Sequence, residues 1–349
     1  MAFDFYGSGN IGDDLMVAGF QEALSTLNPE YSPKVFARTK HNLNCQKLRF
    51  PNISWINNSK SFDTSADHYN EMECWAGVGD TPFQLTSGDW FLNFLLSETK
   101  QFSHFKHKVL VSVGAETEIQ PKLKEFSQVA KLFDRISVRD EHTYAILVDK
   151  LKVPSQKVFL GADLANISLP MVLADCNQAK EFNLGLIVAS ETLSKKDIQE
   201  VGIFIAAQSE PVAFLAGETR NLKNSESYIF SRLTRFPCSR ARGNIVLKFP
   251  DYNRGSLYDL VQPLCACKTV ISSRYHCLLS AAWAGCKVAA IGRSSKVIEL
   301  AKELNIPYCT FPITSEKLEN LFKEATIVSN KLLLSKRDKA LAGVAFCFS

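Results

Sequence analysis

One segment decides the fold of this chain: Val270-Ile-Ser-Ser-Arg-Tyr-His-Cys-Leu-Leu-Ser-Ala-Ala-Trp-Ala-Gly-Cys-Lys-Val-Ala-Ala-Ile-Gly292. Its first apolar run predicts a buried strand, its small residues predict a helix packed closely on a sheet, and a glycine precedes a second buried strand. The turn after the first strand carries Arg274 and His276. Open α/β sheets bind ligands at this end of their strands, and the start of a helix favours anions. The segment therefore predicts a parallel α/β fold with an anion site.

The rest of the chain repeats this alternation of apolar runs and helical patterns. In the first half we expect strands at 3–6, 34–37, 73–79, 109–114, 135–139 and 157–161. The helices of that half are expected at 13–27, 89–98, 123–133 and 141–150. The pattern then restarts, with strands at 184–189, 211–215, 244–249 and 270–273 and helices at 195–208, 226–236, 256–266, 299–304 and 315–334. Such alternation indicates βαβ units with parallel sheets.

Length and spacing predict two domains. A chain of 349 residues exceeds what one hydrophobic core usually fills. The segment 164–182 contains Pro170 and a polar stretch, which favours a linker. We therefore expect an α/β protein of two Rossmann-like domains, residues 1–170 and residues 171–349.

Composition limits the classes of function. The net charge of +4 is small for this length and is not a nucleic-acid signature. The ten cysteines are scattered, and Cys265 and Cys267 lack a second pair at zinc-site spacing, so we expect reduced thiols and no metal site. With no secretory leader and no membrane-spanning run apparent, we expect a cytoplasmic protein. The basic tail at 330–341 predicts a packed helix, the alternative being a helix on the inner face of the membrane.

A glycine-rich segment, Gly7-Ser-Gly-Asn-Ile-Gly-Asp-Asp14, follows the first expected strand and opens the first expected helix. Glycines allow close approach to a ligand, so Gly9, Asn10 and Asp13 are candidate substrate contacts. The acidic pair argues against a dinucleotide site, as does the absence of an acidic residue after the second strand. The alternative is a plain turn in which Asp13 caps the helix.

Three further segments contain candidate site residues because each segment follows a strand. Arg139 ends the strand at 135–139, although a surface salt bridge with Asp140 or Glu141 is the alternative. In the turn after 270–273, Ser273 and the Arg274-Tyr275-His276 segment combine polar groups, a fixed charge and an imidazole. Lys296 follows the next strand as a further cation, the alternative being a solvated surface lysine.

Four segments of the chain resemble the polysaccharide pyruvyl transferase family. These are Gly7-Ser-Gly-Asn-Ile-Gly-Asp13, Ile136-Ser-Val-Arg-Asp140, Leu160-Gly-Ala-Asp-Leu-Ala165 and the long stretch 260–300 that contains Arg274-Tyr-His276. The resemblance implies a fold similar to the B-type (GT-B) glycosyltransferases, with two domains facing across a cleft that holds the site. The first domain would then be the acceptor side, and the second the phosphoenolpyruvate side.

The resemblance also implies the reaction. A pyruvyl group would move from phosphoenolpyruvate onto two hydroxyls of a sugar in an exopolysaccharide, capsule or cell-wall glycan, with release of phosphate. On the matching positions Arg274 and His276 would lie at the phosphoenolpyruvate site, with Arg139 as a second arginine facing it. Tyr275 stands where the family often has leucine. We therefore expect phosphoenolpyruvate as co-substrate, no separate cofactor, and an oligosaccharide or lipid-linked glycan as acceptor.

Arginine matches phosphate and carboxylate groups bidentately, and histidine transfers protons near neutral pH. We therefore expect Arg274 and Arg139 to hold the donor and His276 to act as acid and base. One alternative is a GT-B glycosyltransferase that uses a nucleotide sugar, although no Glu-x₇-Glu pattern is clear in the second half. Another is a non-catalytic glycan-binding protein of the same fold, which the joint presence of Arg274 and His276 disfavours. The oligomeric state and the acceptor sugar stay open.

Overall fold

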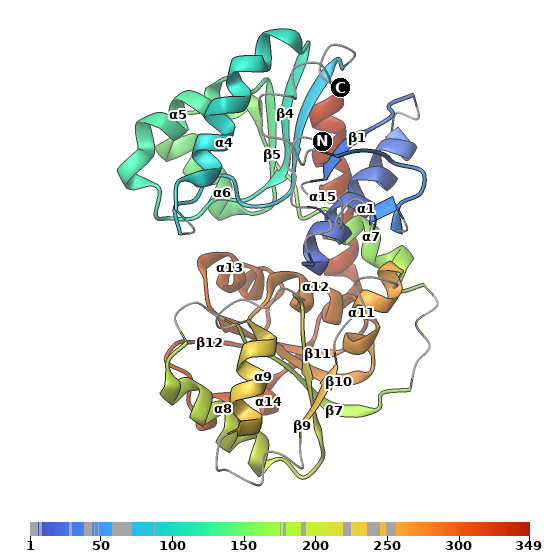
Figure 1. Cartoon of the computed structure of the whole chain (residues 1–349), viewed down its shortest axis with the longest axis vertical. Helices are drawn as coiled ribbons and strands as arrows, with labels where there is room; N and C mark the ends of the chain where they lie inside the picture. Colours follow the sequence, from blue (N-terminus) through green and yellow to red (C-terminus); the bar gives the residue numbers. More distant parts are fainter. Residues whose placement is uncertain are drawn as a thin grey trace. The chain divides into compact units, whose positions relative to one another are not determined.

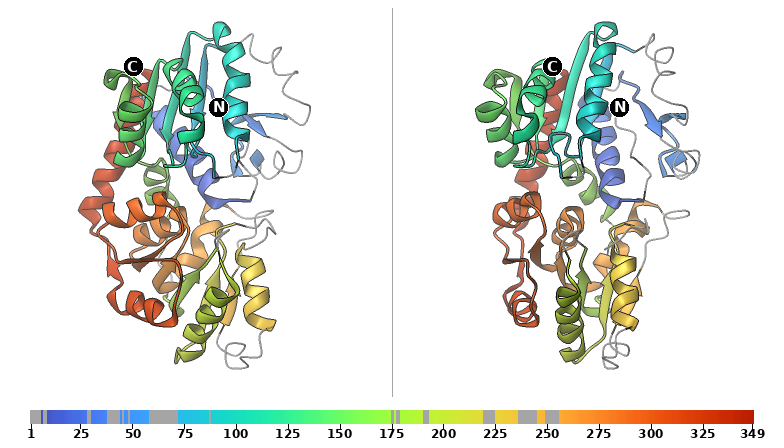
Figure 2. Two further views of the ribbon diagram at one scale, coloured as in Figure 1. Left: turned by 90° about the vertical axis from the view of Figure 1, so that its left-hand side faces the viewer. Right: turned by 60° about the vertical axis from the view of Figure 1, so that its left-hand side comes forward.

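The computed structural model describes residues 6, 9–27, 30–37, 44, 46, 47, 49–57, 72–86, 88–174, 176, 179–189, 193–218, 225–235, 245–248 and 256–349. The chain forms two compact units, each built on a parallel sheet with helices on both faces (Figures 1 and 2). Unit 1 comprises Met1–Ser8, Asp13–Ser168 and Leu334–Ser349, and unit 2 comprises Gly9–Gly12 and Leu169–Leu333. Among the described residues, we find no helix with the length and hydrophobicity that a membrane crossing requires.

The main sheet of unit 1 has the strand order β3-β4-β5-β6, and all its neighbours are parallel. Its strands are β3 (Cys74–Val78), β4 (His107–Val113), β5 (Arg135–Val138) and β6 (Val158–Leu160). A separate parallel pair joins β1 (Lys34–Ala37) to β2 (Ser54–Asn57). The helices in this part of the chain are α1 (Ile11–Leu27), α4 (Trp90–Glu98), α5 (Leu123–Lys131), α6 (Glu141–Ala145) and α7 (Ala165–Val172), with short helical turns at Thr99–His104, Gln120–Lys122, Ile146–Lys150 and Ser155–Lys157.

Aromatic side chains fill the core of unit 1 beside the sheet. Trp75 on β3 is buried, and its ring lies 5.3 Å from that of Phe102 and 5.6 Å from that of Phe133, measured between centroids. The indole N–H donates to Glu98 over 2.7 Å, which satisfies its polar end. The strand β4 has valine at three of its five buried positions and lies inside the sheet, as a parallel strand covered on both faces requires.

The last helix, α15 (Asn330–Phe348), returns to unit 1, whereas the sequence assigned this end of the chain to the second domain. A Cβ on Gly343 would lie 3.3 Å from the side chain of Ser137 on β5, so the small residue lets helix and sheet approach closely. Arg135 donates to the carbonyl of Phe346, and the Phe346 ring stacks on Phe159 of β6 at 5.4 Å. The C-terminal part of α15 is therefore packed against the sheet of unit 1.

Unit 2 contains one sheet with the order β12-β11-β10-β7-β8-β9, to which β13 adds antiparallel to β11. The strands are β7 (Phe182–Ile187), β8 (Val212–Leu215), β9 (Ile245–Lys248), β10 (Cys267–Ser272), β11 (Lys287–Gly292), β12 (Tyr308–Thr310) and β13 (Thr326–Ile327). The helices are α8 (Lys195–Ala207), α9 (Glu226–Arg235), α11 (Leu257–Cys265), α12 (Tyr275–Trp283), α13 (Ser295–Glu303) and α14 (Ser315–Glu324). On one face α8 contacts both α9 and α14, and on the other α12 contacts both α11 and α13.

Most expected elements occur within a few residues of their predicted bounds, and the α/β prediction is confirmed. The single helix predicted at 315–334 is wrong, because an extended residue, Ala325, ends α14 and β13 intervenes before α15. β12 was not predicted. Of the strand expected at 3–6, residues 3–5 lie outside the described residues, and Tyr6 lies in a turn.

Candidate functional site

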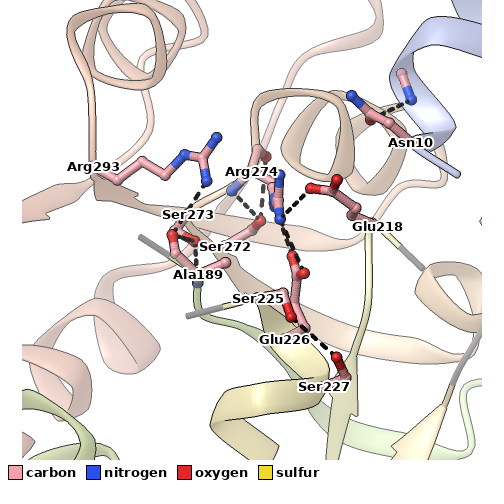
Figure 3. Close-up of polar contacts among 11 residues, drawn as sticks. Asn10, Ala189, Glu218, Ser225, Glu226, Ser227, Ser272, Ser273, Arg274 and Arg293 are labelled. Carbon is pink, nitrogen blue, oxygen red and sulfur yellow. Dashed lines mark hydrogen bonds and ion pairs between the residues drawn. The ribbon is translucent and has the colours of Figure 1, made fainter. Parts of the chain in front are cut away.

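The turn between β10 and α12 is held by its two serines (Figure 3). Ser273 is fully buried, and its hydroxyl donates to the carbonyl of Ala189 over 3.0 Å and accepts from the N–H of Ala189 over 2.8 Å. The hydroxyl of Ser272 accepts from the N–H of Arg274 over 2.9 Å. The serines thus tie the ends of β7 and β10 together and fix the backbone of Arg274. The predicted contact of Ser273 with substrate stays a prediction.

Arg274 lies between two carboxylates of unit 2 (Figure 3). Glu226 accepts from Nε over 2.7 Å and from Nη2 over 3.0 Å, and Glu218 lies 2.9 Å from the same Nη2. The Arg274 side chain is 15% exposed, while those of Glu226 and Glu218 are 0% and 4% exposed. Burial disfavours the charge of Arg274, but the two carboxylates outweigh burial, so the pKa of Arg274 lies above its ordinary value. Arg274, which we predicted to hold the donor, is therefore already paired with two carboxylates.

Sequence reasoning missed both glutamates. Glu226 is the first residue of α9, where an acid is explained by the helix dipole alone. Glu218 follows β8, just after Gly217, outside helix and strand. Neither has a spacing to Arg274 that a motif search detects, because their proximity depends on the strand order of the sheet.

Residues Gly9–Gly12 of the glycine-rich segment belong to unit 2, which they join through backbone contacts. The N–H of Ile11 donates to the carbonyl of Gly217 over 3.2 Å, and Asn10 forms an isolated β-bridge with Glu218. Gly9 has a φ of 102°, a conformation that side chains disfavour. Asn10 directly precedes α1, and its side chain accepts from the N–H of Gly12, in the first turn of the helix, over 3.1 Å. The expected cap, Asp13, is thus replaced in that role by Asn10.

His276 packs directly on this segment. A Cβ built on Gly12 would lie 1.9 Å from Nδ1 of His276, so only glycine fits there. The Tyr275 ring lies 5.1 Å from the imidazole in an edge arrangement. The structure therefore brings together two predicted site motifs, one from each end of the chain. Gly12 was not among the predicted site residues, although it is the third glycine of the motif that predicted Gly9.

The two acids that follow the glycines, Asp13 and Asp14, belong to unit 1. Asp14 is fully buried, and its carboxylate binds Arg49 over 2.9 Å and accepts from the amide of Gln46. Asp13 is 8% exposed in the first turn of α1. The fully buried ion pair of Asp14 with Arg49 accounts for one of the two charges that disfavoured a pyrophosphate site. The predicted substrate contact of Asp13 stays a prediction.

Arg139 is in unit 1, after β5, and its side chain is 3% exposed. Nη2 donates to the hydroxyl of Thr81 over 3.0 Å, Nε lies 3.4 Å from Asp140, and Nη1 lies 4.0 Å from Asp163. The alternative drawn from the sequence, a salt bridge with Asp140, is present, but it is buried rather than on the surface. These contacts give Arg139 a structural role, and its predicted contact with donor stays a prediction.

The turn after β11 carries two further cations of unit 2. Arg293 donates from Nη1 to the carbonyl of Ala189 over 3.4 Å, the residue that also binds Ser273 (Figure 3). Lys296 is half-buried in the first turn of α13. Burial raises the pKa of the Cys277 thiol to about 12; the charge of Glu226 acts in the same direction, and those of Arg274 and Arg293 oppose it. Arg293 therefore lies at the same edge as Arg274, and sequence reasoning missed it.

A cavity of about 300 Å³ lies in unit 1, lined both by apolar side chains such as Phe20 and Phe348 and by charged ones such as Lys34 and Glu73. None of the predicted site residues lines it. Among the described residues, no group of three or more His, Cys, Asp or Glu side chains is placed to hold a metal ion.

Comparison with known proteins gives a family and a fold. The family model for polysaccharide pyruvyl transferases matches residues 10–295. No curated protein matches the sequence. The fold is similar to that of UDP-GlcNAc 2-epimerase from Methanocaldococcus jannaschii (TM-score 0.61, 13% identity, 94% of each chain covered). It is also similar to UDP-GlcNAc 2-epimerase from Neisseria meningitidis bound to UDP-GlcNAc (TM-score 0.60, 13% identity, 94% of this chain and 95% of that chain covered). A third similar structure is Anabaena HepE in complex with UDP and glucose (TM-score 0.59, 10% identity, 95% of this chain and 93% of that chain covered). At these identities the likeness shows a GT-B-like fold.

Proposed function

Because this chain belongs to the polysaccharide pyruvyl transferase family, we propose that it transfers a pyruvyl group from phosphoenolpyruvate onto two hydroxyls of a sugar in a glycan. The product is a cyclic ketal and the released group is inorganic phosphate. Membership of the family indicates a transferase, and the identities of the donor and the acceptor are what we propose. The acceptor would be an oligosaccharide or a lipid-linked glycan of an exopolysaccharide, capsule or cell wall, modified in the cytoplasm.

The observation that carries the proposal is the packing of His276 on Gly12 beside Arg274, at the carboxyl edge of the unit 2 sheet. Within the family match, the imidazole and the guanidinium belong to residues two apart at the start of α12. The first turn of α13, with Arg293 before it and Lys296 in it, adds positive charge and the N–H groups of a helix start. Such groups suit a donor with one phosphate and one carboxylate.

The proposed chemistry needs a proton to leave each of the two sugar hydroxyls and a proton to be added to the methylene carbon. One sugar hydroxyl attacks the central carbon of phosphoenolpyruvate and loses its proton, while the methylene carbon gains a proton and becomes a methyl group. The second hydroxyl then attacks the same carbon, phosphate leaves with the bonding electron pair, and the second hydroxyl proton is lost. His276 is the proposed acid and base, because histidine exchanges protons near neutral pH. Arg274 and the cations after β11 would orient the donor and balance its charge.

Incubation of the purified protein with phosphoenolpyruvate and a panel of oligosaccharide acceptors tests the proposal. We expect acceptor-dependent release of phosphate and a matching mass increase of the acceptor. UDP sugars in place of phosphoenolpyruvate are the control, because the solved structures of similar fold include complexes with UDP and UDP-GlcNAc. Transfer from a UDP sugar, with no reaction of phosphoenolpyruvate, would replace this proposal by the glycosyltransferase alternative.

A further inference from the structure

We propose that Glu218 competes with the donor for Arg274, so that binding of an anionic donor displaces the Glu218 carboxylate from the guanidinium. The inference rests on the proposed function, because it names what phosphoenolpyruvate meets at that same site. It assigns to Glu218 a role in setting donor affinity, and to Glu226 a different role, that of holding Arg274 in place.

The two glutamates bind different edges of one guanidinium. Glu226 takes the edge formed by Nε and Nη2, with distances of 2.7 and 3.0 Å. Glu218 lies 2.9 Å from Nη2, so it meets the other N–H of that nitrogen, which belongs to the outer edge shared with Nη1. No described residue makes a hydrogen bond or ion pair with Nη1. An anion that binds the outer edge bidentately therefore needs the position that Glu218 occupies.

Charge leads to the same conclusion. Two carboxylates face this one guanidinium, and the donor brings a phosphate and a carboxylate of the same sign to it. Two like charges about 4 Å apart weaken binding roughly fivefold even at the dielectric constant of water, and more strongly at a partly buried site. Donor affinity therefore depends on moving one of the carboxylates away.

Glu218 is the carboxylate placed to move. Both glutamates are buried, but Glu226 binds Arg274 through both oxygens and starts α9, so its displacement would break two hydrogen bonds at once. Glu218 contacts Arg274 through one oxygen and lies outside helix and strand. Its backbone is held by the bridge to Asn10, so rotation of the side chain leaves the glycine-rich segment in place.

Calorimetric titration with phosphoenolpyruvate, in the absence of acceptor, measures this competition. Glu218→Gln keeps the size and one acceptor oxygen but removes the charge, so we expect its Kd to fall about fivefold or more. Glu226→Gln should raise the Kd, because Arg274 loses its fixed orientation. The matched control is Glu319→Gln on α14, which makes the same change in net charge at an exposed pair with Lys323, 3.3 Å away. Its Kd should equal that of the wild type.

The outcomes separate this inference from the proposed function. Binding by the wild type, with unchanged or weaker binding by a folded Glu218→Gln protein, overturns the competition and leaves the function standing. No binding and no phosphate release by the folded wild type overturns the function itself. A crystal structure of the wild type with phosphoenolpyruvate needs no variant: we expect Glu218 to lie beyond about 4 Å from Nη2. Persistence of the 2.9 Å contact beside bound donor overturns the inference.

Discussion

Gly12 and His276 are in contact, so that a single methyl group on Gly12 would lie 1.9 Å from Nδ1 of the imidazole. Gly12 lies in the first turn of α1, and His276 is in the helix that follows β10. The glycine therefore fixes where the imidazole lies. This relationship gives the third glycine of the motif a role that does not involve a phosphate.

Replacement of Gly12 by alanine should displace the His276 ring and lower turnover by about 10²-fold, the loss that a 1 Å misplacement of a catalytic group produces. Phosphate release in the presence of acceptor is the measurement. The matched control is Gly202→Ala in α8, whose added methyl would meet only Leu233 at 3.6 Å. That control should keep full activity, and its unfolding free energy should rise by about 0.5–1 kcal/mol. Wild-type turnover of the Gly12→Ala protein would show that His276 does not need this contact.

Removal of the imidazole tests its proposed role directly. We expect His276→Ala to lower turnover by about 10²–10⁴-fold while thermal unfolding stays close to that of the wild type. Donor binding by calorimetry should persist, since Arg274 remains. A loss below about threefold would remove His276 from the proton transfers, because general acid–base catalysis is worth far more than that.

Arg274→Lys separates charge from geometry. Lysine keeps the positive charge but cannot donate to Glu226 along a planar edge, so both donor affinity and turnover should fall. We expect the Kd for phosphoenolpyruvate to rise about tenfold or more, since a bidentate pair loses one of its charge-assisted hydrogen bonds. Calorimetry measures the change, and equal binding by the lysine variant would show that a point charge suffices there.

The buried pairing of Arg139 predicts a loss of stability. Arg139→Ala leaves Asp140 and Asp163 without this cation, so the unfolding free energy should fall by about 3–5 kcal/mol. Urea unfolding at neutral pH measures it. Donor binding by the folded fraction distinguishes the two roles: an unchanged Kd assigns Arg139 to structure alone, and a large increase restores the donor contact predicted from the sequence.

Buried thiols should make the protein sensitive to alkali. Burial raises the pKa of Cys277 and of Cys347 to about 12, above the ordinary value of 9.0 for an exposed thiol. A raised pKa in the folded state means that the folded protein keeps these protons when the unfolded chain has lost them. Their stabilising contribution is therefore complete below pH 9 and is lost as pH rises toward 12. Urea unfolding at pH 8 and pH 10 should show a lower free energy at pH 10, with no loss between pH 7 and 8.

Features that depend on residues close together in the chain could be predicted from the sequence. The β10–α12–β11 unit was predicted because β-branched runs, small residues and a glycine follow one another within 270–292. The pairing of Arg274 with Glu218 and Glu226 was not predicted, since it depends on β8 and β10 lying on either side of β7. The break at Ala325 was missed because the residues around it keep a helical spacing of apolar positions. Contacts between distant strands explain both failures, since the Arg274 cluster depends on strand order and β13, which follows the break, pairs with β11.

The return of residues 334–349 to unit 1 has a consequence for biosynthesis. Translation delivers Leu169–Leu333, nearly all of unit 2, before the ribosome makes the helical segment that covers β5 and β6. The sheet of unit 1 is therefore synthesised first but keeps an apolar face uncovered until α15 is made. Unit 2 can already fold during that time. Nascent chains arrested short of this segment would be the ones to engage chaperones.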